Sequence, residues 1–168
     1  ESAPVYRFGE PSPQFYERAP WGDGAVRSRI EALSALAWSD DQTLQPIVVT
    51  SARALLQRTL PFTQFSRIAL QLTKGERFPL EKLVARWVSM GYEPVTLVTE
   101  PGQFSRRGGV LDIFPVSHDS PVRVEFFDDE IDGLRRFDTS TQRTLAYLGS
   151  VAIPPAREAL PEHGPLLA

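Results

Sequence analysis

The sequence predicts an α/β layer followed by a smaller α+β domain in which an antiparallel sheet is packed by one helix. The first 73 residues contain a helical apolar stripe, a short apolar strand and a second helical segment, the order typical of an α/β layer. From residue 95 onward the apolar residues recur every second position, which is typical of strands. We therefore expect an α/β remnant over 1–73, an α+β domain over 74–150, and a return segment toward the first domain over 151–168.

The first layer is built from three predicted elements after an opening loop. Residues 2–24 are rich in Pro, Gly and aromatics, which favours an ordered loop. Residues 25–38 form a helix capped by Asp23, with its apolar stripe at Val26, Ile30, Leu33 and Ala37. The run PIVVT at 46–50 predicts a buried strand, which favours parallel pairing. Ser51 then caps a helix over 52–60, which Pro61 ends.

A strand is expected within residues 66–75, ahead of the boundary near Lys74, and the second domain then begins with a clear amphipathic helix over 78–92. Pro79 lies in the first turn of this helix and Gly91 at its end. Five strands are then expected, separated by the turn signals PGQFSRRG, VSHDS, DD and TSTQ, at 95–100, 109–115, 121–127, 130–138 and 143–154. This pattern predicts an antiparallel meander covered by the helix. The tail from Glu158 is rich in Pro and is expected to leave the domain.

Composition excludes several classes of function. The chain has 168 residues and a net charge of -3, without a block of five like charges, so a nonspecific polyanion binder is disfavoured. It has no Cys, which excludes disulfides and thiolate zinc sites, and no phosphate loop of the GxxxxGK[ST] type. Neither His lies at a triad spacing, and no apolar run reaches the length of a membrane span. The missing initiator Met indicates an excised fragment.

The strand over 121–127 carries the candidate binding residues. Strand alternation places Val122, Val124 and Phe126 on one face, and Arg123, Glu125 and Phe127 on the other. An aromatic beside an Arg on a charged face has the composition of an interface core. The alternative is that another layer covers Phe127.

The flanking motifs allow two interpretations each. Arg106 and Arg107, before two glycines, are either bidentate donors to an anionic group or part of a solvated turn. The acidic run at Asp128, Asp129, Glu130 and Asp132 fits a hairpin turn better than a metal site.

A long motif then indicates a family. The segment FSRRGGVLDIFPVSHDSPVRVEFFDDEIDGLRRFDTSTQRTL closely resembles the second domain of the bacterial transcription-repair coupling factors (Mfd), within the module that they share with the excision-repair helicase subunit UvrB. PIVVTSARALLQRTLP resembles the end of the first part of domain 1, and SVAIPPAREAL resembles the return to domain 1. The resemblance runs from about Arg27 onward and is weak across residues 9–24. It implies that the α/β layer is a partial RecA-like domain.

The resemblance also implies a function and a set of residues. It implies a cytoplasmic module that recruits the damage-recognition ATPase UvrA to lesions at stalled RNA polymerase, with Arg107, Arg123 and Phe127 contacting UvrA and Arg106 and Glu125 at the periphery. The parent is implied to be an ATP-dependent DNA translocase that uses Mg²⁺ and binds RNA polymerase and duplex DNA. This chain is expected to have no catalytic, metal or cofactor site. The alternatives are a fragment of UvrB, which has a similar R-G-x-x-x-D-I-F-P core, and a DNA-binding module.

Overall fold

The computed structural model describes residues 2–10, 22–38 and 45–158, and it divides into two compact units. Unit 1 consists of Glu1–Ser66 and Arg157–Ala168, and unit 2 of Arg67–Ala156. The boundaries predicted from the sequence, after residues 73 and 150, differ from this division by a few residues at each end. Residues 11–21 of the expected loop over 2–24, and the Pro-rich tail after Glu158, lie outside the described residues.

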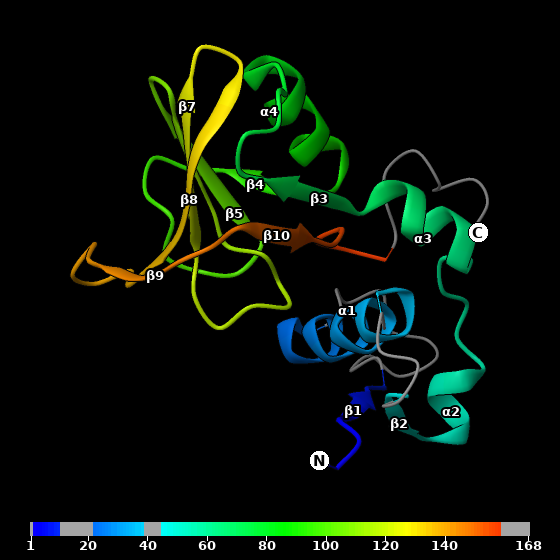
Figure 1. The fold of residues 1–168 in the computed structure, drawn as a ribbon. Coiled ribbons are helices and arrows are strands. Elements are labelled where there is room, and N and C mark those ends of the chain that lie inside the picture. The colour runs from blue at the N-terminus through cyan, green and yellow to red at the C-terminus, as the bar shows by residue number, and fades with distance from the viewer. Residues whose placement is uncertain (1, 11–21, 39–44, 159–168) are drawn as a thin grey trace. The chain divides into compact units, whose positions relative to one another are not determined.

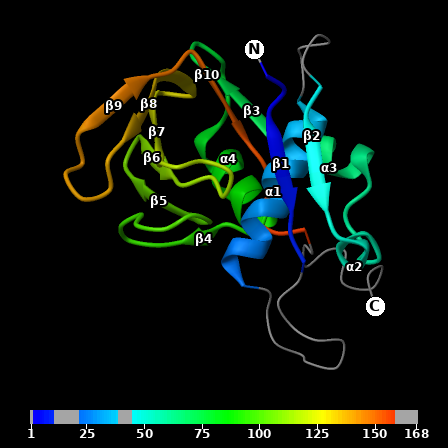
Figure 2. The same ribbon diagram turned by 90° about the horizontal axis from the view of Figure 1, so that it is seen from below.

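Unit 1 is a small α/β layer built on two parallel strands. Strands β1 (Val5–Phe8) and β2 (Ile47–Thr50) pair in parallel, and their arrows lie side by side and point the same way in Figure 2. Unit 1 also contains α1 (Asp23–Ala37), α2 (Ala52–Leu55) and most of α3 (Phe62–Ile68), whose last two residues belong to unit 2. Alternate strand residues pack against the helices in a core of Phe8, Ala32, Ala54, Tyr6, Leu33 and Val48. The predicted α/β layer with parallel pairing is confirmed. The strand at 46–50, expected to be buried, is not: Ile47 and Val49 are exposed, because only the Val48 side of β2 packs against the core.

Several local predictions in unit 1 need correction. Residues 5–8, expected in a loop, form β1, because the short VYRF run between Pro4 and Gly9 pairs with β2. Helix α1 is capped by Gly22, and Asp23 lies in its first turn instead. Ser51 does cap α2, accepting a hydrogen bond from the Ala54 amide at 3.1 Å. That helix ends at Leu55, and Pro61 begins α3 by accepting hydrogen bonds from two amides of its first turn.

Unit 2 is a six-stranded sheet with one long helix against it (Figure 1). The sheet order is β4-β5-β6-β7-β8-β9, antiparallel except for β4 and β5. The strands are β4 (Glu93–Pro94), β5 (Gln103–Arg107), β6 (Val110–Ile113), β7 (Val122–Phe127), β8 (Glu130–Phe137) and β9 (Thr144–Tyr147). Helix α4 (Leu80–Ser89) buries Leu83 and Trp87, and the Trp87 ring meets Phe104 of β5 edge-on at 5.6 Å. The expected α+β domain is confirmed.

The ends of unit 2 form a separate two-stranded ribbon. β3 (Leu70–Thr73) pairs antiparallel with β10 (Ser150–Ile153). The single strand predicted over 143–154 is therefore two strands: β9 belongs to the large sheet, and β10 pairs with β3 outside it. The prediction of a strand over 95–100 is wrong. Those residues form a turn whose Thr99 and Glu100 amides donate to the Gln103 side chain, and the segment after it, expected to be a turn, is β5.

Candidate functional site

The face of the large sheet opposite α4 carries the residues singled out from the sequence. Residues paired across neighbouring strands share a face. The register joins Asp112 to Arg123, Arg123 to Arg135, and Arg135 to Tyr147, whereas Phe104, beneath α4, belongs to the other face. We call the first surface the arginine face; it comprises Arg107, Asp112, Arg123, Glu125, Phe127 and Arg135.

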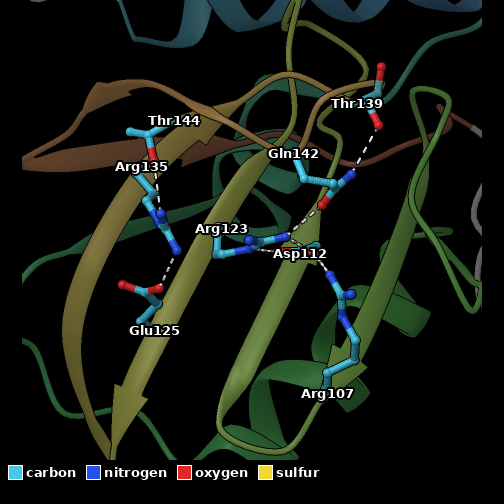
Figure 3. Close-up of polar contacts among 8 residues, drawn as sticks. All are labelled: Arg107, Asp112, Arg123, Glu125, Arg135, Thr139, Gln142 and Thr144. Atoms are coloured by element: carbon cyan, nitrogen blue, oxygen red, sulfur yellow. Dashed lines mark hydrogen bonds and ion pairs between the residues drawn. The ribbon is translucent and has the colours of Figure 1, made fainter.

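Asp112 is the centre of the arginine face. Its side chain is 2% exposed and lies in the middle of β6. It accepts hydrogen bonds from Arg123 Nε at 2.6 Å and Nη2 at 2.8 Å, and from Arg107 Nη2 at 2.7 Å (Figure 3). One buried carboxylate therefore holds both arginines predicted to form the site.

The two arginines differ in exposure. The Arg123 side chain is 13% exposed, and its guanidinium lies 4.5 Å over the Phe137 ring. The hydrogen bonds that Arg123 donates to Asp112 raise the pKa of Arg123 above its ordinary value, so it stays charged at any accessible pH. Arg107 is 52% exposed at the end of β5, where Gly108 adopts φ +62° to turn the chain into β6. Arg107 is thus the more accessible of the two positive charges.

A second ion pair lies beside the first. Glu125 Oε1 accepts a hydrogen bond from Arg135 Nη2 at 2.6 Å, and Arg135 Nη1 donates to the Thr144 hydroxyl at 2.8 Å (Figure 3). Gly133 lies opposite Glu125, and a Cβ at that position would approach Glu125 Oε2 to 2.9 Å. The absence of a side chain at 133 therefore lets Glu125 lie flat across β8.

Phe127 is 80% exposed at the tip of the β7–β8 hairpin. The turn is made by Asp128, at φ +58°, and Asp129, as the acidic run predicted. The hairpin tip is supported by residues 75–78, which make backbone hydrogen bonds of 2.8 to 2.9 Å with Asp129 and Ile131. A largely exposed aromatic is therefore carried on a well-supported strand, and no described side chain covers most of its surface.

Arg106 lies on the other face of the sheet. It pairs with Leu111 across the strands, and its guanidinium contacts Glu81 of α4 at 2.7 Å. The two adjacent arginines of the RRGG motif thus point to opposite faces, and only Arg107 belongs to the arginine face. Arg106 therefore forms an ion pair that links β5 to helix α4.

Three participants were missed from the sequence: Asp112, Arg135 and Gln142. Gln142, from the TSTQ turn, accepts a hydrogen bond from Arg123 Nη2 at 2.9 Å. Asp112 could have been found, because it interrupts the apolar run VLDIF and a carboxylate inside a central strand needs a cationic partner. The other two depend on strand register and on a turn geometry that alternation does not give.

Other kinds of site were sought in the part of the chain that the structure describes. Within those ranges no group of three or more His, Cys, Asp or Glu side chains could hold a metal ion. No helix there is long and apolar enough to cross a membrane.

These features agree with a known class of domain. Residues 70–158, just over half of the chain, match the family described as the UvrB interaction domain. The chain therefore belongs to the UvrB interaction domain family, a class of interaction module in DNA repair. The match spans the six-stranded sheet with the arginine face.

The chain also resembles curated proteins named transcription-repair-coupling factors. It is 42% identical over 130 residues to that of Myxococcus xanthus, covering 77% of this chain and 11% of the relative. The protein of Mycobacterium tuberculosis (strain CDC 1551 / Oshkosh) is 42% identical over 133 residues, covering 77% and 11%. That of Escherichia coli (strain K12) is 38% identical over 112 residues, covering 67% and 10%. The predicted resemblance is confirmed, and the chain spans about a tenth of the length of these relatives.

Proposed function

We propose that the arginine face recruits the damage-recognition ATPase UvrA. The observation that carries the proposal is Phe127, which is 80% exposed beside a cluster of ordered arginines. Hot spots of protein interfaces are enriched in aromatic and Arg side chains surrounded by polar groups. Exposing most of a Phe side chain to water is unfavourable, so a partner that covers Phe127 gains the free energy of burying its apolar surface.

The charges on this face indicate the chemistry of the partner. Arg107 is half exposed and Arg123 presents only its outer edge, while Glu125 is already paired with Arg135. The arginine face thus holds three arginines against two carboxylates, which leaves one positive charge on it, while the acidic turn residues Asp128 and Asp129 lie beyond Phe127. An apolar pocket flanked by carboxylates on UvrA would complement it.

The proposal includes the setting of the parent protein. We propose that this chain is the recruitment part of a cytoplasmic coupling factor, an ATP- and Mg²⁺-dependent DNA translocase that acts on RNA polymerase stalled on duplex DNA. The chain itself is proposed to bind and not to catalyse. ATP turnover by the purified chain, with or without DNA, would contradict this part of the proposal.

Calorimetric titration of the chain with purified UvrA tests the proposed contact. Phe127→Ala should weaken binding at least about 30-fold, the equivalent of about 2 kcal/mol at a hot spot. Phe62→Ala makes the same truncation at another exposed Phe, in unit 1, and should bind as wild type. Because both side chains are largely exposed, neither change should alter the free energy of unfolding by more than about 0.5 kcal/mol.

Arg107 is a better test of charge than Arg123. Substituting Arg123 leaves Asp112 buried beside an empty site, so lost binding would be confused with lost folding. Arg107→Glu should weaken UvrA binding more than Arg107→Ala, because it places a carboxylate opposite the partner's acidic groups. Unchanged binding by Phe127→Ala would overturn the proposed surface. Steeply salt-dependent binding of duplex DNA would favour the DNA-binding alternative.

A further inference from the structure

The guanidinium of Arg123 has a fixed orientation. An Arg side chain has five N–H donors. The single donor on Nε and one on Nη2 bind Asp112, and a second bond from Nη2 goes to Gln142. Among the described residues Nη1 has no hydrogen-bond partner, so its two donors remain for a ligand. The Phe137 ring below the guanidinium, 4.5 Å from it, blocks the other side.

Gln142 is held in an unusual backbone conformation. Its φ is +59°, in the left-handed region that disfavours side chains other than Gly and Asn. Its backbone N–H donates to the Asp138 carbonyl at 2.8 Å. Its side-chain Nε2 donates to the Thr139 carbonyl at 3.0 Å (Figure 3). The side-chain amide is thereby oriented with Oε1 toward Arg123.

A Gly would suit this backbone better, so the Gln is explained by what its side chain does. The only hydrogen bond that its Oε1 accepts within the described residues comes from Arg123. Local strain kept at a position that serves a neighbouring side chain is typical of functional sites. The turn 138–142 is itself stabilised by the Asp138 carboxylate, which accepts hydrogen bonds from Ser140 and Thr141.

We propose that Gln142 and Asp112 are positioning residues of the UvrA-binding surface: they fix Arg123 from two sides so that its Nη1 edge faces a partner carboxylate. Asp112 does the same for Arg107. This inference rests on the proposed function. It assigns a role to the TSTQ turn, which contacts the partner only through the arginine that it orients.

The sharpest test separates binding from stability at Gln142. Gln142→Gly relieves the backbone strain and removes the acceptor, so the thermal unfolding midpoint should stay the same or rise. Binding to UvrA should nevertheless weaken about tenfold, the loss expected for one hydrogen bond to a charged group. A merely structural role predicts the opposite, with lower stability and unchanged affinity.

Two further variants isolate the acceptor. Gln142→Met keeps the length of the side chain without the oxygen and should weaken UvrA binding to a similar extent as Gln142→Gly. Gln71→Met makes the same change on the exposed side of β3 and should bind as wild type. In an Arg123→Lys background, which cannot pair side-on with Asp112, Gln142→Gly should have less than about a twofold further effect on binding, because the two residues act through one interaction.

A readout on the free chain distinguishes this inference from the proposed function. NMR relaxation of the Arg123 Nε–H group should show that the group is ordered in the wild-type chain and mobile in Gln142→Gly. If wild type binds UvrA but Gln142→Gly binds within twofold of it, or Arg123 stays equally ordered, the positioning role is overturned and the recruitment function stands. If wild type does not bind UvrA, the proposed function fails and this inference fails with it.

Discussion

The two arginines bound to Asp112 should contribute very unequally to folding. Arg123 makes two hydrogen bonds to the carboxylate and is 13% exposed, whereas Arg107 makes one and is 52% exposed. Removing one partner of a buried ion pair costs about 3–5 kcal/mol, because the other charge is left without its counter-ion. An exposed pair contributes about 0.2–1 kcal/mol. We therefore expect coupling energies of about 3 kcal/mol for Asp112 with Arg123 and about 0.5 kcal/mol for Asp112 with Arg107.

Double-mutant cycles measured by urea unfolding test this difference. The cycles combine Asp112→Ala with Arg123→Ala and with Arg107→Ala. Arg136→Ala, an exposed Arg on the same strand as Arg135, serves as a control that should couple to Asp112 by less than about 0.3 kcal/mol. Equal coupling energies for the two arginines would show that burial does not decide the strength of the ion pair with Asp112.

Three other changes have defined outcomes. Glu158→Gln should lower the free energy of unfolding by about 3 kcal/mol, because it removes a carboxylate charge bound to the fully buried Arg29. Denaturant unfolding that shows less than about 1 kcal/mol would contradict this. Trp87→Ala should cost about 3–5 kcal/mol in the same assay, and Trp87→Phe less than half as much, because Phe still fills most of the site and removes a buried indole N–H that has no partner. Hydrogen bonds from Ser140 and Thr141 lower the pKa of Asp138 to about 2. The contribution of its carboxylate to stability is therefore complete above about pH 4 and is lost as the pH falls toward about 2. Asp138→Asn should flatten the pH dependence of the free energy of unfolding in that window, and an unchanged profile would exclude this role.

The parts predicted correctly were those governed by local periodicity. The apolar stripe of α4 and the alternation in β7 both survive in the structure, because each buries its apolar side against the same core. Phe127 is exposed, as the interpretation of its strand face as an interface required; the alternative was that another layer covers it. The acidic turn between β7 and β8 followed from the tolerance of Asp for left-handed backbone.

The parts that failed depend on partners distant in sequence. Strand β1 is too short to be recognised without β2, and Arg29 pairs with Glu158, 129 residues away. In β8 the register shifts opposite Glu125 and Phe126, so that Ile131 and Leu134 are both buried although they are three positions apart in the sequence. A period of two cannot describe such a strand. Asp112 stands out in the sequence as a charge inside an apolar run, but its pairing with Arg123 depends on the register of β6 and β7, and the contact from Gln142 depends on the geometry of the turn after β8.

The ribbon of β3 and β10 bears on how this domain could have spread among proteins. Leu70 pairs with Ile153, so the chain enters and leaves unit 2 on adjacent strands. A domain whose two ends lie side by side can be inserted into a surface loop of an unrelated host without disturbing either fold. A single gene-insertion event would therefore transfer the whole sheet, with its arginine face already assembled, and the host would need to supply only two neighbouring attachment points.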